Sequence, residues 1–352
     1  MSPPNPPLAT RTLPYGQAAI AEAAALIAAG GVVAIPTETV YGLAADATES
    51  RAVAGVYAAK GRPSINPLIV HVLDRAAAEA IAVFDADAGA LADAFWPGPL
   101  TLVLPLRADA GIAALVTAGL DTIAIRVPAH RAMRALLEAT GKPLAAPSAN
   151  ASGAISPTRA EHVVASLGGR IPLVVDDGAT EAGLESTIVM TGEGVRILRP
   201  GPITSEALAA TLFPGERVPG RIVPRTILEH AGHAQPGTGP VSEAIVTGRR
   251  PSPEKVKITA PGQLESHYAP SKSLRINAGF PEPDEWLIGF GPVAGDDTLS
   301  ASGDLIEAAA NLFSALYRAD ASPKPRIAVA PIPETGLGIA INDRLRRAAH
   351  SD

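Results

Sequence analysis

The sequence contains no cysteine, few aromatic residues and little lysine. The absence of cysteine excludes disulfides, thiolate nucleophiles, cysteine-ligated zinc and iron–sulfur clusters, and it fits a reducing compartment. Aromatic residues make up 4% of the chain, and the net charge is −6 at pH 7. Proteins that coat nucleic acid are usually basic and offer aromatic stacking surfaces, so this composition argues against that class.

Long apolar runs and several common motifs are also missing. No stretch reaches the ~18 apolar residues of a membrane span, and the Pro-rich start MSPPNPPLATRTLPYG does not resemble a signal peptide, so we expect a soluble, cytoplasmic protein. There is no Walker motif, no complete GxGxxG and no GxSxG. His230 and His233 lack nearby acidic or thiolate ligands, which favours solvated histidines over a metal site.

The remaining composition predicts two folded domains and a connector. The 352 residues are 47% hydrophobic and 18% charged, as expected of a compact core. Residues 213–272 carry a net charge of +3 between two acidic segments and are rich in Pro and Gly. We therefore predict domains at 1–212 and 273–352 joined by a linker at 213–272, which is either a lid or a flexible spacer.

Hydrophobic patterns in the first region predict a twisted mixed or mostly parallel sheet of the α/β class. We expect helices over 17–29, 51–60, 86–95 and 158–167, and strands over 32–36, 68–73, 100–106, 122–127, 144–147, 171–175, 186–190 and 195–198. In the last region, strands at 274–277, 286–290 and 327–330 and helices at 303–318 and 338–349 predict a small open α/β unit.

Polar clusters follow several of these strands and helices. The run from Pro36 to Leu43 is either a binding loop or a capped turn. Lys60 and Arg62 stand two residues apart, and such a pair can hold a polyphosphate or simply end a helix in solvent. Arg126 lies within an apolar strand, so it needs an anion, which is either a ligand carboxylate or a neighbouring Asp.

Small and hydroxyl-bearing residues form a further run at 145–153, with Ser156 just beyond it. Small side chains let a ligand approach the backbone, while hydroxyls and an amide can bind it. Three more clusters stand at 185–187, 199–201 and 261–270. Together these clusters predict a polar binding site at the strand ends.

The motifs, in order, resemble the YrdC-like family. They are GGVVAIPTETVYGLAADA, KGRPSINPLIVHV, FWPGPLTLVL, TIAIRVP, APSANASGAISPT, ESTIV and ILRPGPIT. PGQLESHYAP and PIPETGLGIAINDRLRRAA are similar to its long, two-domain form. The resemblance covers nearly the whole chain.

This resemblance implies a fold and an activity. Family members of this form make threonylcarbamoyl-AMP and pyrophosphate from L-threonine, bicarbonate and ATP, as nucleotidyltransferases, and the product feeds the threonylcarbamoyladenosine modification of tRNA. The resemblance also implies a YrdC-like catalytic domain with a positive cavity, a smaller Rossmann-like α/β domain, and a linker across the mouth of the site. Expected partners are these small molecules and the downstream tRNA-modifying machinery.

The family's functional residues are carried over position by position. The resemblance implies catalytic roles for Lys60 and Arg62. For L-threonine it implies contacts from Thr39, His71, Arg126, Ala146 and Ser186. For ATP it implies Lys60, Arg62, Asn66, Thr122, Ser148, Asn150, Ser156, Arg199 and Tyr268. In the linker motif only His267 and Tyr268 match, because Leu264 and Glu265 replace the Lys-Tyr of archaeal-type members. Magnesium is expected to bind through the phosphates, with Ser148 and Asn150 as candidate side chains.

Two other functions are compatible with the same fold. One is an RNA-binding or regulatory module without turnover, against which the acidic net charge, the six lysines and the few aromatic residues stand. The other is a carbamoyltransferase domain of the hydrogenase-maturation type, which would require zinc-binding cysteines that this chain lacks.

Overall fold

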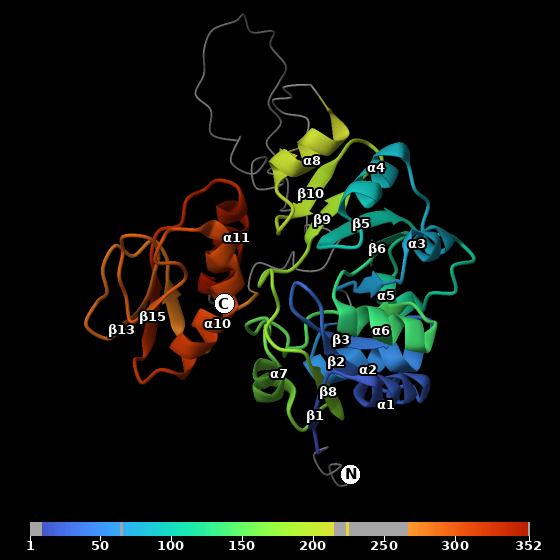
Figure 1. Cartoon of the computed structure of the whole chain (residues 1–352), viewed down its shortest axis with the longest axis horizontal. Coiled ribbons are helices and arrows are strands. Elements are labelled where there is room, and N and C mark those ends of the chain that lie inside the picture. Colours follow the sequence, from blue (N-terminus) through green and yellow to red (C-terminus); the bar gives the residue numbers. More distant parts are fainter. Residues whose placement is uncertain (1–8, 64–65, 215–222, 225–266, 351–352) are drawn as a thin grey trace, which may run out of the picture.

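Strands gather into two separate sheets, one built from the first two thirds of the chain and one from its end (Figure 1). The structure is a computed structural model, and it describes residues 9–63, 66–214, 223–224 and 267–350. Most of the predicted linker at 213–272, including His230, His233 and the run 261–266, lies outside the described residues.

The first sheet has eleven strands in the order β1-β8-β2-β3-β7-β4-β6-β5-β9-β10-β11. Five neighbouring pairs are parallel and five are antiparallel, so the sheet is mixed, which confirms the predicted α/β class. The strands are β1 (Arg11–Pro14), β2 (Val33–Pro36), β3 (Tyr41–Asp46), β4 (Ile69–His71), β5 (Leu100–Pro105), β6 (Thr122–Arg126), β7 (Leu144–Ala145), β8 (Leu173–Asp176), β9 (Thr187–Met190), β10 (Arg196–Arg199) and β11 (Val223–Pro224).

Eight helices accompany this sheet in the described residues. They are α1 (Gln17–Ala28), α2 (Ser50–Lys60), α3 (Arg75–Ile81), α4 (Ala86–Phe95), α5 (Ala114–Thr117), α6 (Arg131–Thr140), α7 (Ala160–Leu167) and α8 (Ser205–Leu212). Capping residues define where several of these helices begin or end. Asp74 and Asp85 accept hydrogen bonds from the first turns of α3 and α4, and Gly61 ends α2 at φ +60°.

Alternate side chains of the central strands enter different cores. Val33 and Ile35 of β2 pack in a cluster with residues of α1 and α6, whereas Ala34 belongs to the larger cluster that includes α2, α4 and α7. This alternation is the normal consequence of the pleat, and both faces of the strand are therefore covered.

The second sheet is fully parallel and has the order β12-β15-β13-β14. Its strands are β12 (Ser273–Arg275), β13 (Glu285–Gly289), β14 (Asp297–Thr298) and β15 (Arg326–Val329), and its helices are α10 (Leu305–Ala321) and α11 (Leu337–Ala349). The observed order of strands and helices confirms the predicted small α/β unit.

Helices α10 and α11 lie between the small sheet and the first unit (Figure 1). Their hydrophobic cluster extends into that unit, because it also contains Val40, Ile155 and Leu184. Polar contacts reinforce the junction: the Tyr317 hydroxyl of α10 donates to the Ile155 carbonyl at 2.8 Å, and the hydroxyls of Thr158 and Ser314 lie 3.0 Å apart. The two units therefore share a continuous, buried interface.

The predicted elements differ from the structure mainly around short or functional segments. The expected loop over 36–43 ends early, because β3 begins at Tyr41 and pairs with β2. The sequence predicts neither the strands β1, β3, β11 and β14 nor the helices α3, α5, α6 and α8. None of the helices in the described ranges is long and apolar enough to cross a membrane.

A glycine at the interface gives a test of this packing. Gly183 adopts φ +66°, and a Cβ there would lie 2.5 Å from the Cα of Ala310 on α10. We expect Gly183→Ala to lower the free energy of unfolding by roughly 2–5 kcal/mol, from left-handed strain of about 1–2 kcal/mol plus overpacking of about 1–3 kcal/mol. Thermal and urea unfolding measure this.

Gly178→Ala is the matched control, since Gly178 has φ +80° but open space around its Cβ position. It should show the strain alone, about 1–2 kcal/mol. Equal losses in the two variants would mean that the α10 contact is not tight.

Candidate active site

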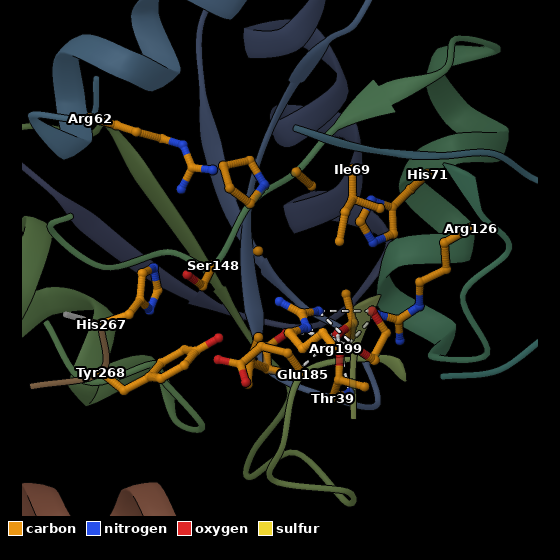
Figure 2. Close-up of a pocket in the computed structure, with 16 residues that line it drawn as sticks. Thr39, Arg62, Ile69, His71, Arg126, Ser148, Glu185, Arg199, His267 and Tyr268 are labelled. Atoms are coloured by element: carbon orange, nitrogen blue, oxygen red, sulfur yellow. Dashed lines mark hydrogen bonds between the residues drawn. The ribbon is translucent and has the colours of Figure 1, made fainter. Parts of the chain in front are cut away.

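One cavity collects side chains from distant parts of the chain. Figure 2 shows Arg62, His267 and Tyr268 on one side, His71 and Arg126 on the opposite side, and Ser148 between them. Its lining residues are Thr37, Thr39, Val40, Gly42, Arg62, Ile69, His71, Arg126, Ala146, Pro147, Ser148, Glu185, Ser186, Arg199, His267 and Tyr268. Strand ends and the loops after them therefore build the site, as in other open α/β sheets.

The turn between β2 and β3 is held by its own hydroxyls. The Thr37 hydroxyl donates to the Val40 carbonyl at 2.7 Å and accepts from the Thr39 and Val40 amides at 3.2 Å. The Thr37 and Thr39 hydroxyl oxygens also lie 2.8 Å apart. The segment is thus a capped turn that also forms a wall of the cavity, and its role as a binding loop stays a prediction.

Arg126 finds its counter-ion on this turn. Its Nη2 lies 2.6 Å from Oε1 of Glu38, Nη1 donates to the Thr39 hydroxyl at 2.9 Å, and Nε donates to the Gly98 carbonyl at 3.2 Å. Burial alone would raise the pKa of Glu38, but the Arg126 guanidinium outweighs it and holds this pKa below its usual value. The anion that the sequence required is therefore a glutamate of the chain, rather than an Asp.

His71 stands beside Arg126 at the end of β4. Its side chain is buried, and burial together with the positive charge of Arg126 lowers its pKa to about 3. In the portion of the chain that the structure describes, its Nδ1 has no hydrogen-bond partner. His71 is therefore a neutral side chain in the cavity wall.

Lys60 lies behind the cavity wall. It is 2% exposed, and its Nζ donates to the carbonyls of Ser148 and Asn150, both at 2.5 Å. The Ser152 amide donates to the Lys60 carbonyl at 2.8 Å. These three contacts fix the loop from Ser148 to Ser152 against the end of α2.

Arg62 and Arg199 supply two further buried cations. Arg62 donates to the carbonyl of Pro67 at 3.1 Å, and burial lowers its pKa to about 10, with Arg199 adding to the effect. Arg199 donates to the Ser186 carbonyl through Nε at 3.1 Å and to the Ser186 hydroxyl through Nη2 at 3.1 Å. Both guanidinium groups donate hydrogen bonds to neutral oxygens, and the Glu185 carboxylate also interacts with the charge of Arg199.

Glu185 is a cavity residue to which sequence reasoning gave no role. Its Oε1 accepts from the Ser156 hydroxyl at 2.5 Å, and its Oε2 accepts from Arg344 of α11 at 2.7 Å. The motif ESTIV pointed to this segment, but its partner Arg344 lies 159 residues later and no local pattern announces the contact.

The structure brings together most of the predicted site residues. Those that line the cavity are Thr39, Arg62, His71, Arg126, Ala146, Ser148, Ser186, Arg199 and Tyr268. Those that lie outside its lining are Lys60, Asn66, Thr122, Asn150 and Ser156. Lys60 and Ser156 contact lining residues directly, whereas Thr122 starts the strand that Arg126 ends. The roles predicted for all of these residues remain predictions.

A magnesium ion would meet mainly neutral oxygens here. Among the described residues, no group of three or more His, Asp or Glu side chains could hold a metal ion. Ser148 lines the cavity, and Oδ1 of the buried Asn150 has no hydrogen-bond partner within the described ranges. These oxygens fit a magnesium ion that is held chiefly by phosphates and water.

The neutral state of His71 can be tested by titration. We expect its imidazole ring to remain neutral at pH 5, as followed by NMR and assigned by the loss of the signals in His71→Gln. An unfolded histidine binds a proton near pH 6.5 and folded His71 only near pH 3. Its contribution to stability is therefore complete above pH 6.5 and declines below it, by up to roughly 1.4 kcal/mol per pH unit. A midpoint between pH 6 and 7 in the folded protein would show that His71 is solvated instead.

Two family models match successive parts of the chain. A family model of the Sua5, YciO and YrdC proteins, described as "Telomere recombination", matches residues 25–201, and one described as "Threonylcarbamoyl-AMP synthase, C-terminal domain" matches residues 203–350. The threonylcarbamoyl-AMP synthase of Bacillus subtilis is 39% identical, with 94% of this chain and 92% of that protein covered. The Pyrococcus abyssi protein of the same name is 37% identical, with 93% of each covered.

A solved structure agrees with these matches. The crystal structure of Pyrococcus abyssi Sua5 complexed with L-threonine superposes with a TM-score of 0.79, at 33% identity and with 97% of each chain covered. Sequence and fold thus agree over both units. The chain belongs to the threonylcarbamoyl-AMP synthase family, in the form that joins the Sua5/YrdC region to the C-terminal domain.

Proposed function

We propose that this enzyme synthesises threonylcarbamoyl-AMP from L-threonine, bicarbonate and ATP, with release of pyrophosphate and water, as a nucleotidyltransferase. The observation that carries the proposal is a single cavity with Arg126 at one end and the buried cations Arg62 and Arg199 at the other, in a chain of this family. The relatives named above and the L-threonine bound to the Pyrococcus abyssi protein support the choice of substrates.

The threonine half of the site is built around Arg126. Its guanidinium would hold the substrate carboxylate with a charge-assisted pair of hydrogen bonds, while Glu38 and Thr39 fix its orientation from behind. His71 and Ser186 complete this half, and Ala146 would act through its backbone. Because His71 is neutral, it adds no charge that would repel the substrate's ammonium group.

The nucleotide half is built around Arg62 and Arg199. Both lie in the cavity lining, so they would neutralise the triphosphate, with Ser148 and Tyr268 beside them. Lys60 would act through the loop that its ammonium holds, which carries Ser148 and Asn150. Asn66, Thr122 and Ser156 are retained as ATP-side residues on the resemblance alone. Magnesium, held by the phosphates with Ser148 and Asn150, would add positive charge at the same place.

The reaction then needs positioning more than covalent help. The threonine amine attacks the carbon of bicarbonate, a C–N bond forms, and the displaced hydroxide takes the amine proton and leaves as water. A carboxylate oxygen of the resulting carbamate attacks the α-phosphorus of ATP, and the bond to the pyrophosphate oxygen breaks. Exclusion of water around the bound substrates would protect the carbamate from reverting, and the cations would stabilise the charge that moves to pyrophosphate. With a pKa of about 3, His71 is a weak base, which favours proton transfer among the substrates themselves.

Pyrophosphate release tests this proposal. We expect the purified chain to release it only when ATP, L-threonine and bicarbonate are all present. Arg126→Ala should reduce turnover at subsaturating threonine by about 10- to 150-fold, since a charge-assisted hydrogen bond contributes about 1.5–3 kcal/mol, and it should leave ATP affinity nearly unchanged. Calorimetry with ATP separates the two effects.

Arg131→Ala is the matched control, because Arg131 is exposed, contacts Asp177 and the Tyr15 ring, and does not line the cavity. Its turnover should equal that of the wild type. Equal loss of threonine use and ATP binding in Arg126→Ala would contradict the assigned role. RNA binding without any turnover of the three substrates would favour the regulatory-module alternative.

A further inference from the structure

Glu185 poses an electrostatic problem for the proposed ATP-binding half of the cavity. Its carboxylate lines the cavity close to Arg199, and it is 6% exposed. A buried negative charge in that position would repel an incoming phosphate chain. It would also cancel part of the positive charge that Arg199 brings to the site.

The C-terminal unit supplies a compensating charge. Arg344 of α11 has no exposed surface, and its Nε donates to Oε2 of Glu185 at 2.7 Å. Burial alone would raise the pKa of Glu185, but Arg344, Arg199 and the Ser156 hydroxyl together hold it below its usual value. Glu185 is therefore an anion whose charge is met by an arginine from the other unit.

The pair is also fixed in orientation. Arg344 donates through Nη1 to Asp343 at 2.7 Å, and its guanidinium carbon lies 5.3 Å from the centre of the Tyr268 ring. Ser156 occupies the other oxygen of Glu185 at 2.5 Å. Both Glu185 oxygens thus have donors from the protein, and Arg199 keeps its own contacts to Ser186.

We infer that Arg344 is a positioning residue of the active site, which acts through Glu185 from the C-terminal unit and keeps the phosphate-binding end of the cavity cationic. The inference rests on the proposed function for the identity of the anion. It gives the C-terminal unit an electrostatic part in ligand binding, because without Arg344 the Glu185 charge would be offset mainly by Arg199, and the positive charge of Arg199 would then be lost to the bound anion.

Pyrophosphate binding to the full-length chain, measured by calorimetry, tests this directly. Arg344→Met should weaken binding on the order of 10- to 100-fold, the effect of one uncompensated charge several ångströms from a bound anion at an effective dielectric of about 20. Adding Glu185→Gln to Arg344→Met removes that charge and should restore affinity to within about threefold of the wild type. A purely structural contact would show no such rescue, so a double variant as weak as Arg344→Met would overturn the inference, as would normal binding by Arg344→Met alone.

Arg346→Met is the matched control, because Arg346 lies on the same helix and forms an exposed ion pair with Glu334. It should bind pyrophosphate as the wild type does. If Arg344→Met fails to fold, pyrophosphate binding by the single variant Glu185→Gln tests the inference instead. Binding at least as tight as that of the wild type supports the inference, and binding more than tenfold weaker overturns it. Absence of turnover by the wild-type chain would defeat the proposed function, whereas this binding series would still report on Arg344.

Discussion

Three arginine side chains are buried around one cavity, and burying their charges costs free energy. The other residues of the site offset this cost with hydrogen bonds and counter-charge. Arg62, Arg126 and Arg199 are 8%, 3% and 4% exposed. A buried cation is stable only with hydrogen bonds and a counter-charge. Arg126 has both in Glu38, Thr39 and the Gly98 carbonyl, whereas Arg62 and Arg199 have chiefly neutral carbonyl and hydroxyl partners. This difference divides the cavity into an end already balanced in charge and an end that favours an anion.

The fold supplies these partners from segments far apart in the sequence. The mixed sheet brings the ends of β4 and β6 beside the β2–β3 turn, and the loop after β7 is tied to α2 through Lys60. The C-terminal unit contributes through α11, where Arg344 reaches Glu185. The two units are thus joined by packing and also by charge, so the family's second region takes part in the electrostatics of the first.

The sequence predicted the residues that line the cavity better than it predicted the ion pairs between them and the rest of the chain. The polar runs after strands and the buried position of Arg126 identified most of the cavity lining, because such residues are unusual in those contexts. The counter-ions were harder to predict: Glu38 was assigned only to a loop, and the Arg344–Glu185 pair depends on how two units meet. Amphipathic helix α6 and edge strand β1 were missed, since short elements are stabilised by tertiary packing more than by local propensity. The spacing of Lys60 and Arg62 suggested a polyphosphate-binding pair, yet the contacts of Lys60 are to the backbone of the neighbouring loop.

A crystal structure of the chain with L-threonine and a non-hydrolysable ATP analogue is the most direct measurement of the central claim. The account predicts both molecules in the same cavity, with the threonine carboxylate on Arg126 and the triphosphate between Arg62 and Arg199. Ligands bound far apart, or a triphosphate that contacts neither arginine, would contradict it.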